Sequence, residues 1–192
     1  SSHGQNAFSH KDKKLRRYES QICYKFDVNL SFLLKITFLG TGTSQGIPVI
    51  GSTHPVCLSA DPKDKRLRVS VLLELDDGGI YVIDCGPDFR QQMLHHQVSR
   101  LDGILFTHEH ADHTAGIDDI RPFFFRQGDI PIYAHSRVIN SLQRRFDYIF
   151  AGENRYPGAP AVAVRTISEG QPFKLGNHWV TPVDARHNRL QV

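Results

Sequence analysis

The chain has 192 residues, of which 40% are hydrophobic and 22% are charged, and its formal net charge is +3. Such a chain is long enough to bury one hydrophobic core. It lacks an apolar run of the ~18 residues that a membrane helix needs, so we expect no membrane span. Its three cysteines form an odd, sparse set, which argues against a disulfide framework and favours a reducing, cytoplasmic location.

Residues 1–34 differ in charge from the rest of the chain. They hold six of the 23 basic residues but three of the 20 acidic ones, which leaves residues 35–192 neutral. A basic leader of this kind is either an arm for nucleic acid or a membrane surface, or a disordered extension. It has no apolar core like that of a signal peptide. We favour the extension and expect the folded domain to span residues 35–192.

A glycine-rich loop follows the first strand-like run. Residues 36–39 are expected to form a short strand that breaks at Gly40-Thr41-Gly42-Thr43-Ser44-Gln45-Gly46. This loop either presents backbone N–H groups to an anion or forms a tight turn. The charged segment 61–68 is likewise open to two interpretations, a solvated loop or a basic edge that meets a phosphate-bearing substrate.

Strand and helix patterns alternate through the remaining sequence. They predict strands over 69–75, 80–83, 130–133, 162–167 and 178–183, and helices over 89–98, 115–127 and 136–150. The first two strands flank Asp76-Asp77-Gly78-Gly79, which is typical of a hairpin turn. Alternation of this kind predicts an α/β fold built in layers.

Three histidines and an aspartate fall within six positions, directly after the apolar run 101–106. They are His108, His110, Asp112 and His113. His108 and His110 are two positions apart at a strand end, so they project from the same side and can hold one ion. Asp112 and His113 can face a second ion close by. Imidazole and carboxylate ligands suit zinc, manganese or iron, so this motif predicts a metal site.

At these residues the sequence resembles the metallo-β-lactamase superfamily, whose signature is His-x-His-x-Asp-His. The resemblance runs from Lys35 to the end of the chain. It implies an αββα sandwich with two divalent metal ions, zinc or manganese, at one edge of its sheets.

The resemblance also implies a role for each site residue. Asp112 would bind the second ion with His113 and orient the attacking hydroxide. His187, beyond the last strand-like run, would join His108 and His110 at the first ion. Asp84 would support the metal loop from behind, with a helix-capping role as the alternative. The other histidines considered, His54, His95, His96, His135 and His178, have no such positional support and are interpreted as surface residues.

The glycine-rich loop indicates which groups within this superfamily the sequence resembles most. Gly-Thr-Gly-Thr-Ser-x-Gly-x-Pro is similar to the opening of proteins related to the phosphoribosyl cyclic phosphodiesterase and the transfer-RNA 3′-processing endonuclease. The phosphodiesterase-like group often has Cys-x-Cys-x-x-Cys next, which holds a structural zinc. This chain has Ser52, His54 and Cys57 there, too few ligands to close such a site, so we expect the zinc clip to be lost and Cys57 to be buried.

The resemblance implies a metal-dependent hydrolase. We expect a phosphodiesterase that acts on a small cyclic or nucleotide-like phosphate diester through a hydroxide activated by two metal ions. A transfer-RNA 3′-processing type of endonuclease is the alternative, although no strongly basic RNA-docking arm is evident. A catalytically silent fragment or metal-binding module is the third reading. The oligomeric state is left open, with a homodimer among the alternatives.

The superfamily pattern continues beyond His187 with an aspartate that bridges the two ions and a last histidine. Residues 188–192 contain neither. We therefore expect the chain to correspond to the N-terminal half to two-thirds of such a domain. Its sandwich would be incomplete at the C-terminus, and its second sheet would have an unpaired edge.

Overall fold

The computed structural model describes residues 22–23, 34–187 and 190–191, and it describes side chains within residues 34–185, apart from that of Glu153. The prediction that residues 1–34 form a leader or disordered extension falls almost entirely outside this description. It stays a prediction, as does the domain boundary at residue 35.

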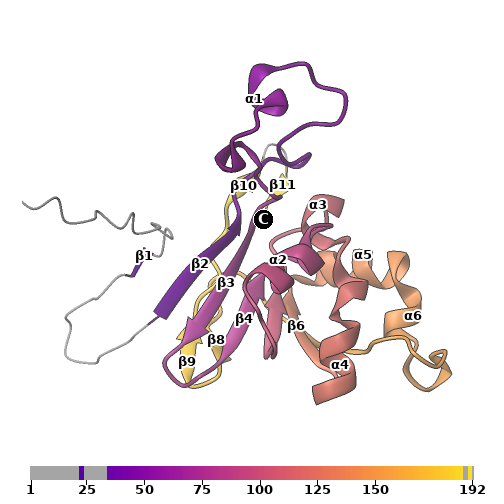
Figure 1. The fold of residues 1–192 in the computed structure, drawn as a ribbon. Coiled ribbons are helices and arrows are strands. Elements are labelled where there is room, and N and C mark those ends of the chain that lie inside the picture. Colours follow the sequence, from indigo (N-terminus) through magenta and orange to yellow (C-terminus); the bar gives the residue numbers. More distant parts are fainter. Residues whose placement is uncertain (1–21, 24–33, 188–189, 192) are drawn as a thin grey trace, which may run out of the picture.

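A seven-stranded mixed sheet forms the centre of the molecule (Figure 1). Its strands lie in sequence order: β1 (Ile22–Cys23), β2 (Leu34–Gly40), β3 (Ser70–Leu75), β4 (Ile80–Ile83), β5 (Gly103–Leu105), β6 (Ile130–Ala134) and β7 (Val162–Thr166). Strands β1 to β4 pair antiparallel, which confirms the predicted β3–β4 hairpin, whereas β4 to β7 run parallel. Parallel strands bring their carboxyl ends to one edge, where functional loops gather.

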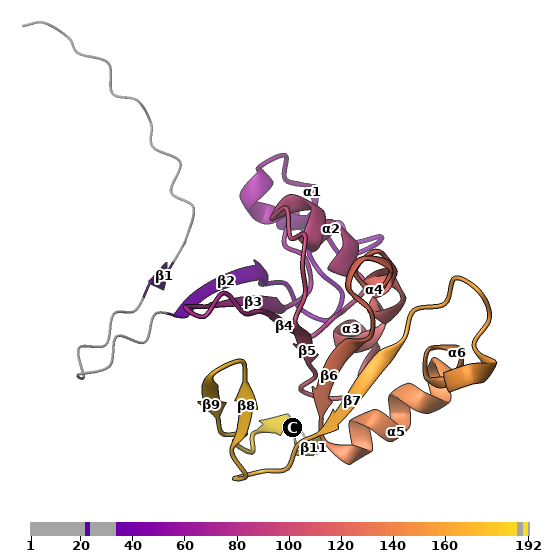
Figure 2. The same ribbon diagram turned by 90° about the horizontal axis from the view of Figure 1, so that it is seen from below.

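Helices cover one face of this sheet and short hairpins lie over the other. The helices are α1 (Pro55–Leu58), α2 (Phe89–His95), α3 (Ala111–Thr114), α4 (Arg121–Gln127), α5 (Ser136–Arg145) and α6 (Asp147–Phe150). Figure 2 shows α2, α3 and α4 on one side of the sheet, with β8 (Phe173–Leu175) and β9 (His178–Val180) on the other. The predicted α/β class is confirmed.

The main hydrophobic core lies between the sheet and its helices. Ile104 of β5, Ile132 of β6, Phe89 of α2 and Leu142 of α5 are fully buried in it. Each such side chain contributes roughly 1.5–3 kcal/mol of burial free energy. A second, smaller cluster around Leu175 of β8 packs the β8–β9 hairpin onto the opposite face. The parallel strands β5 and β6 are therefore anchored by the main core, through Ile104 and Ile132.

Two predicted helices are divided in the structure. In place of one helix over 115–127, α3 begins inside the histidine motif, a 3-10 turn spans Ile117–Ile120, and α4 follows with Pro122 in its first turn. Proline is accepted there because a first-turn N–H has no helical partner. The helix predicted over 136–150 breaks at Phe146, whose backbone (φ −130°, ψ 42°) separates α5 from α6.

The last predicted strand, 178–183, ends at Val180 and pairs with a strand that the sequence did not reveal. That strand, β8, has three residues, too few for a hydrophobic alternation to show. The interpretation of His178 as a surface residue is wrong, because its side chain is only 17% exposed and lies against Asp76.

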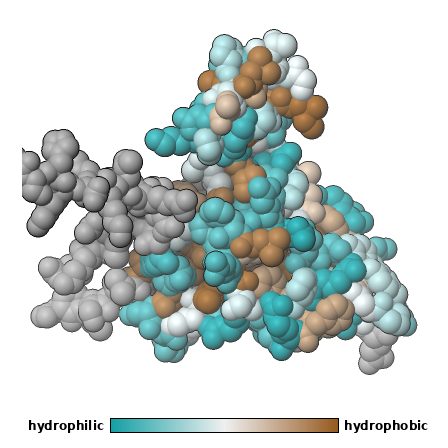
Figure 3. Space-filling model, in the orientation of Figure 1, coloured by the Kyte–Doolittle hydropathy of each residue, from teal (hydrophilic) through white to brown (hydrophobic). Residues whose placement is uncertain are grey.

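An arm formed by residues 47–66 includes α1 and stands away from the sheet (Figure 1). Hydrophobic side chains gather near its tip in Figure 3, and both Ile50 and Leu58 are largely exposed. The outer end of the arm is thus apolar, although charged side chains follow in residues 61–66.

Hydrogen bonds within the arm involve Ser52, His54 and Cys57, the three residues for which the sequence predicts no zinc clip. The N–H of His54 donates to Ser52 Oγ (3.2 Å), and His54 Nδ1 accepts from Val56 N (3.3 Å), which caps α1. Cys57 Sγ accepts from the N–H of Val49 (3.4 Å). Cys57 is half-buried rather than fully buried as predicted.

The helices of the described residues are short. The ten-residue α5 has half of the roughly 20 residues that cross a bilayer, and no helix in the described part of the chain is long and apolar enough to do so. Cys57 and Cys85 are free thiols, and the side chain of Cys23 lies outside the described part of the chain. Burial raises the pKa of Cys85 well above its usual value.

Candidate metal centre

The histidine loop, residues 107–113, follows β5 at the carboxyl edge of the parallel strands. His110 has extended backbone (φ −61°, ψ 150°), and α3 begins at the next residue, with Asp112 and His113 in its single turn. His108 is buried and His110 is exposed. The local structure is therefore the one that the spacing predicts: a strand end followed by one helical turn. His108 lies in the interior and His110 at the surface.

Four potential ligand atoms of the loop form two close pairs. His108 Nε2 lies 3.0 Å from His110 Nδ1, and His113 Nε2 lies 3.3 Å from Asp112 Oδ2. Two ligands bonded to one tetrahedral zinc ion at about 2.0–2.2 Å would be about 3.3–3.6 Å apart. Each pair thus has nearly the spacing that one ion requires. Their nitrogen and oxygen atoms are of the kinds that divalent transition metals accept as ligands.

Asp84 supports the loop from the end of β4. Its Oδ1 accepts a hydrogen bond from Thr107 N (2.9 Å), and its Oδ2 lies 2.8 Å from Thr107 Oγ1 and 2.6 Å from His113 Nδ1. Asp84 is buried and has φ 63°, a left-handed conformation that aspartate and asparagine tolerate better than most residues. The capping alternative is not seen, because Asp88 is the residue that precedes α2.

These hydrogen bonds assign the tautomers of two histidines. Thr107 Oγ1 donates its one proton to Asp84, so its 3.0 Å contact with His108 Nδ1 needs Nδ1 to be the donor. His113 Nδ1 likewise donates to Asp84. In a neutral ring of this tautomer Nε2 is unprotonated, and in each ring Nε2 faces the other ligand of its pair: His110 Nδ1 for His108 and Asp112 Oδ2 for His113. A carboxylate that orients imidazoles in this way is a recurrent support of metal-binding histidines.

Negative charge is concentrated around His113. Burial lowers the pKa of His113, but the hydrogen bond to Asp84 and the charges of Asp84 and Asp112 outweigh it and raise the pKa above its usual value. The same charges would stabilise a metal cation bonded to this ring, since a metal competes with the proton for the same lone pair.

Two glycines let the histidine loop pack against the turn after β4. A Cβ at Gly86 would lie 2.1 Å from Asp112 O, and one at Gly116 would lie 2.1 Å from Gly86 O. The backbone N–H of Cys85 donates to His113 O (2.8 Å), and that of Gly116 donates to Cys85 O (2.9 Å). The two segments form one hydrogen-bonded unit, which the sequence pattern did not reveal.

Gly86→Ala is expected to destabilise the fold by about 1–3 kcal/mol, the usual cost of overpacking, because the turn and Asp112 must move apart. Chemical denaturation would measure this loss, and zinc affinity should fall with it. Gly51→Ala is the control, since its Cβ would meet nothing within 4 Å and only its φ of 73° costs energy. The control should keep wild-type zinc affinity; equal affinity in Gly86→Ala would contradict the packing argument.

Helix α5 supports the histidine loop from a second direction. Arg145 Nη2 donates to Glu109 O (2.9 Å) and to Thr114 Oγ1 (3.0 Å), and Thr114 Oγ1 donates to His110 O (2.8 Å). Arg137, at the start of the helix, has its Nε 3.3 Å from Glu109 Oε2. These contacts fix the backbone on both sides of His110. These contacts cannot be recognised from the sequence pattern, because both arginines belong to a separate helix.

The glycine-rich loop 40–46 packs closely on its neighbours. A Cβ at Gly40 would lie 2.0 Å from Arg68 O, so close backbone packing explains this glycine. Arg68 Nε donates to Ser44 O (2.9 Å), while its guanidinium pairs with Asp88 (2.9 Å). Of the two interpretations of the loop, the tight turn therefore has direct support. Arg68, from the charged segment, holds the loop in place.

A cavity of about 500 Å³ opens beside the histidine loop, a volume typical of small-molecule sites. It lies at the ends of β4, β5 and β7, and residues 182–185 close it from the other side. Thr107, His135 and Arg137 are among its polar residues. His135 Nδ1 accepts from Arg137 N (3.2 Å), so in the neutral ring Nε2 is a donor.

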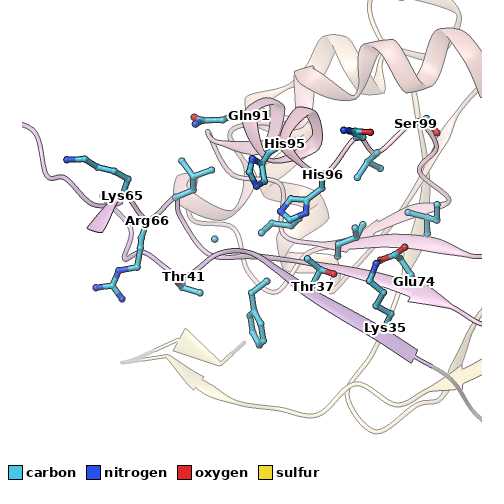
Figure 4. A pocket seen from close by; sticks show the side chains of 18 residues that line it. Lys35, Thr37, Thr41, Lys65, Arg66, Glu74, Gln91, His95, His96 and Ser99 are labelled. Atoms are coloured by element: carbon cyan, nitrogen blue, oxygen red, sulfur yellow. The ribbon is translucent and has the colours of Figure 1, made fainter. Parts of the chain in front are cut away.

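A larger cavity, about 710 Å³, lies between β2 and the end of α2 (Figure 4). In Figure 4, His95 and His96 line its helix side, whereas Thr37 and Thr41 line its sheet side. The histidine loop contributes nothing to its lining. We therefore associate the chemistry with the smaller cavity, which Thr107 adjoins.

His187 lies in β10 (Arg186–His187), which pairs with β11 (Leu190–Gln191). It follows the β8–β9 hairpin, as expected of the next ligand, but its side chain is outside the described part of the chain. Its assignment to the first ion stays a proposal. The structure does bring together the other five predicted residues: Asp84, His108, His110, Asp112 and His113.

Solved structures share this architecture. A diphosphatase described as a new member of the PhnP family is 35% identical, with a TM-score of 0.73, and the match covers 82% of this chain and 60% of that one. Zinc-bound PqqB from Methylobacterium extorquens is 20% identical, with a TM-score of 0.64 over 78% of this chain and 51% of that one. At least one protein of this fold thus binds a divalent metal.

A Porphyromonas gingivalis protein named octanoyltransferase is 39% identical over 159 residues, which cover 83% of this chain but 32% of that protein. The chain therefore spans less than two-thirds of the length of each of these relatives. The model of the β-lactamase superfamily domain matches residues 80–191, more than half of the chain. With its α/β layers and its His-x-His-x-Asp-His loop, the chain belongs to the metallo-β-lactamase-fold superfamily of hydrolases.

Proposed function

We propose that this chain contains the metal centre of a phosphodiester hydrolase, in which His108 and His110 bind one divalent ion and Asp112 and His113 bind a second. The observation that supports it most is the presence of two ligand pairs in one loop, with 3.0 Å between His108 Nε2 and His110 Nδ1 and 3.3 Å between His113 Nε2 and Asp112 Oδ2. Thr107 of the same loop lines a cavity. His187 would complete the first ion's ligands. Zinc and manganese suit this mixture of imidazole and carboxylate.

Two ions at such a centre supply a nucleophilic hydroxide at neutral pH and neutralise charge that develops on the phosphoryl oxygens. The chain's residues do the positioning. Asp112 would hold the second ion together with His113, whose Nε2 lies 3.3 Å from its carboxylate, and would orient the attacking water. Asp84 and Thr107 hold His108 and His113 in the tautomer whose unprotonated Nε2 can bind a metal.

The cavity beside the loop suggests the substrate class. Arg137 brings a guanidinium to its wall and His135 an imidazole N–H, two groups that bind phosphate oxygens. Its volume of about 500 Å³ suits a small molecule, and the 35% identical relative is a diphosphatase. We infer a small cyclic or nucleotide-like phosphate diester as the substrate.

Hydrolysis of bis(p-nitrophenyl) phosphate by the metal-free chain after addition of zinc or manganese tests this proposal. Metal-dependent turnover that the substitution His110→Ala removes would support it. Turnover of a β-lactam with none of the diester would contradict the phosphodiester assignment. Metal binding with turnover of neither would favour the catalytically silent reading.

A transfer-RNA 3′-processing type of nuclease is the alternative. Binding of RNA through its phosphates should weaken steeply with salt, and residues 35–192 are neutral overall. RNA affinity measured at two salt concentrations, together with RNA cleavage, separates this alternative from a small-molecule diesterase.

A further inference from the structure

Two hairpin turns meet at the end of the sheet that lies farthest from the histidine loop. The β3–β4 turn begins at Asp76, and the β8–β9 turn contains Gly176 and Asn177. In Figure 1, the β8–β9 hairpin lies beside the lower ends of β3 and β4, whereas α3 is near the opposite end. Whatever these turns bind is therefore separate from the proposed catalytic centre.

Asp77 locks the two turns together. Its Oδ1 accepts a hydrogen bond from Gly79 N (2.9 Å), and its Oδ2 accepts one from Asn177 N (2.7 Å). A Cβ at Gly176 would lie 2.2 Å from Asp77 Oδ2, so this close approach requires glycine. The N–H groups of Asn177 and Gly79 lower the pKa of Asp77, which keeps its carboxylate charged.

An imidazole faces this turn. His178 Nε2 lies 2.6 Å from Asp76 Oδ1 and 3.9 Å from Asp77 Oδ2, and one ligand atom from each of the three side chains lies within 4.8 Å of the others. The His178 and Asp77 side chains are 17% and 15% exposed, and that of Asp76 is 33% exposed. As whole residues, Asp76 and Asp77 are exposed and His178 is half-buried, so the group lies at the surface and is open to solvent.

We propose that Asp76, Asp77 and His178 form a metal site that binds zinc, or a transition-metal ion with a similar preference for nitrogen and oxygen ligands. The bound ion would join the β8–β9 hairpin to the sheet. Two ligands of one tetrahedral ion are about 3.3–3.6 Å apart. The contacts of 2.6 and 3.9 Å bracket that value, so shifts below about 1 Å would suffice. Water would supply the fourth ligand.

The donor chemistry selects the ion. One imidazole nitrogen with two carboxylate oxygens is a typical zinc ligand set, whereas calcium and magnesium prefer ligands that are all oxygen. Metal ligands bind as carboxylates and as neutral imidazole, so the three bound side chains would carry a charge of −2, which a divalent cation neutralises. By joining two turns that are about 100 positions apart in the chain, the ion would stabilise the folded state, because the unfolded chain does not hold these ligands together.

Metal content tests the proposal. Zinc bound per chain is measured by elemental analysis after dialysis against buffered zinc, for wild type, His178→Ala and Asp76→Asn. Both variants should lose one equivalent, and their zinc-dependent rise in melting temperature should shrink. Asp76→Asn keeps the side-chain size and leaves the Asp77 contacts untouched, so it decides the matter even if His178→Ala folds poorly.

The controls are His95→Ala and Asp129→Asn, which remove an exposed histidine and an exposed aspartate elsewhere and should keep wild-type zinc content. The site is independent of the catalytic proposal, since His110→Ala should leave this equivalent in place. Equal zinc content and equal thermal shift in wild type and Asp76→Asn would overturn it. The contact between His178 and Asp76 would then be an ion pair only.

Discussion

The substitution His110→Ala is expected to weaken binding of the first ion by at least about 100-fold and to abolish diester hydrolysis. The estimate is a lower bound, because even residues that only support a metal ligand typically cost 10–100-fold in affinity when replaced. His110 is exposed, so the metal-free variant should keep its stability to within about 0.5 kcal/mol. Isothermal titration with zinc and a denaturation curve measure the two effects.

His95→Ala is the matched control for His110→Ala, since it removes another exposed histidine, one that lines the other cavity. It should leave both zinc binding at the loop and hydrolysis unchanged. Full hydrolysis by His110→Ala would show that the first ion is held elsewhere or is not needed.

Asp84→Asn should lower metal affinity by about 10–100-fold while the backbone stays in place. Asparagine tolerates the left-handed conformation of residue 84 (φ 63°), and its carbonyl oxygen can still accept from Thr107 N. The NH₂ group that replaces Oδ2 would face Thr107 Oγ1, which can accept a hydrogen bond instead of donating one, and His113 Nδ1, which donates to Oδ2 in the wild type. His113 would then change tautomer and protonate the Nε2 that should bind the metal.

Zinc titration of Asp84→Asn, with Asp129→Asn as an exposed control, measures this effect. Imidazole nitrogen chemical shifts report the tautomer of His113 directly. Wild-type affinity together with an unchanged tautomer would contradict the supporting role of Asp84.

The ligands of the candidate site could be predicted because they are contiguous. A strand end followed by one helical turn places His108 with His110 and Asp112 with His113 by local geometry alone, and the structure has both pairs. The position of the site at the carboxyl edge of the parallel strands follows from the alternation of strands and helices in the sequence.

The supports of the site could not be predicted, because they depend on contacts between distant segments. Arg145 reaches the loop from another helix, and Gly86 is required only because Asp112 O lies against it. The burial of His178 likewise depends on the β8–β9 hairpin folding over the sheet. Hydrophobic periodicity reports which face an element buries, and it does not report which polar groups meet across the fold.

Anomalous diffraction at the zinc edge, from crystals of the zinc-loaded chain, tests the central claim most directly. Two peaks about 3.5–4 Å apart are expected at the histidine loop, one bonded to His108 and His110 and the other to Asp112 and His113. Absence of any zinc bonded to His108 and His110 would contradict the account, because the loop would then be a hydrogen-bonded structural element and the hydrolytic centre would have to lie elsewhere.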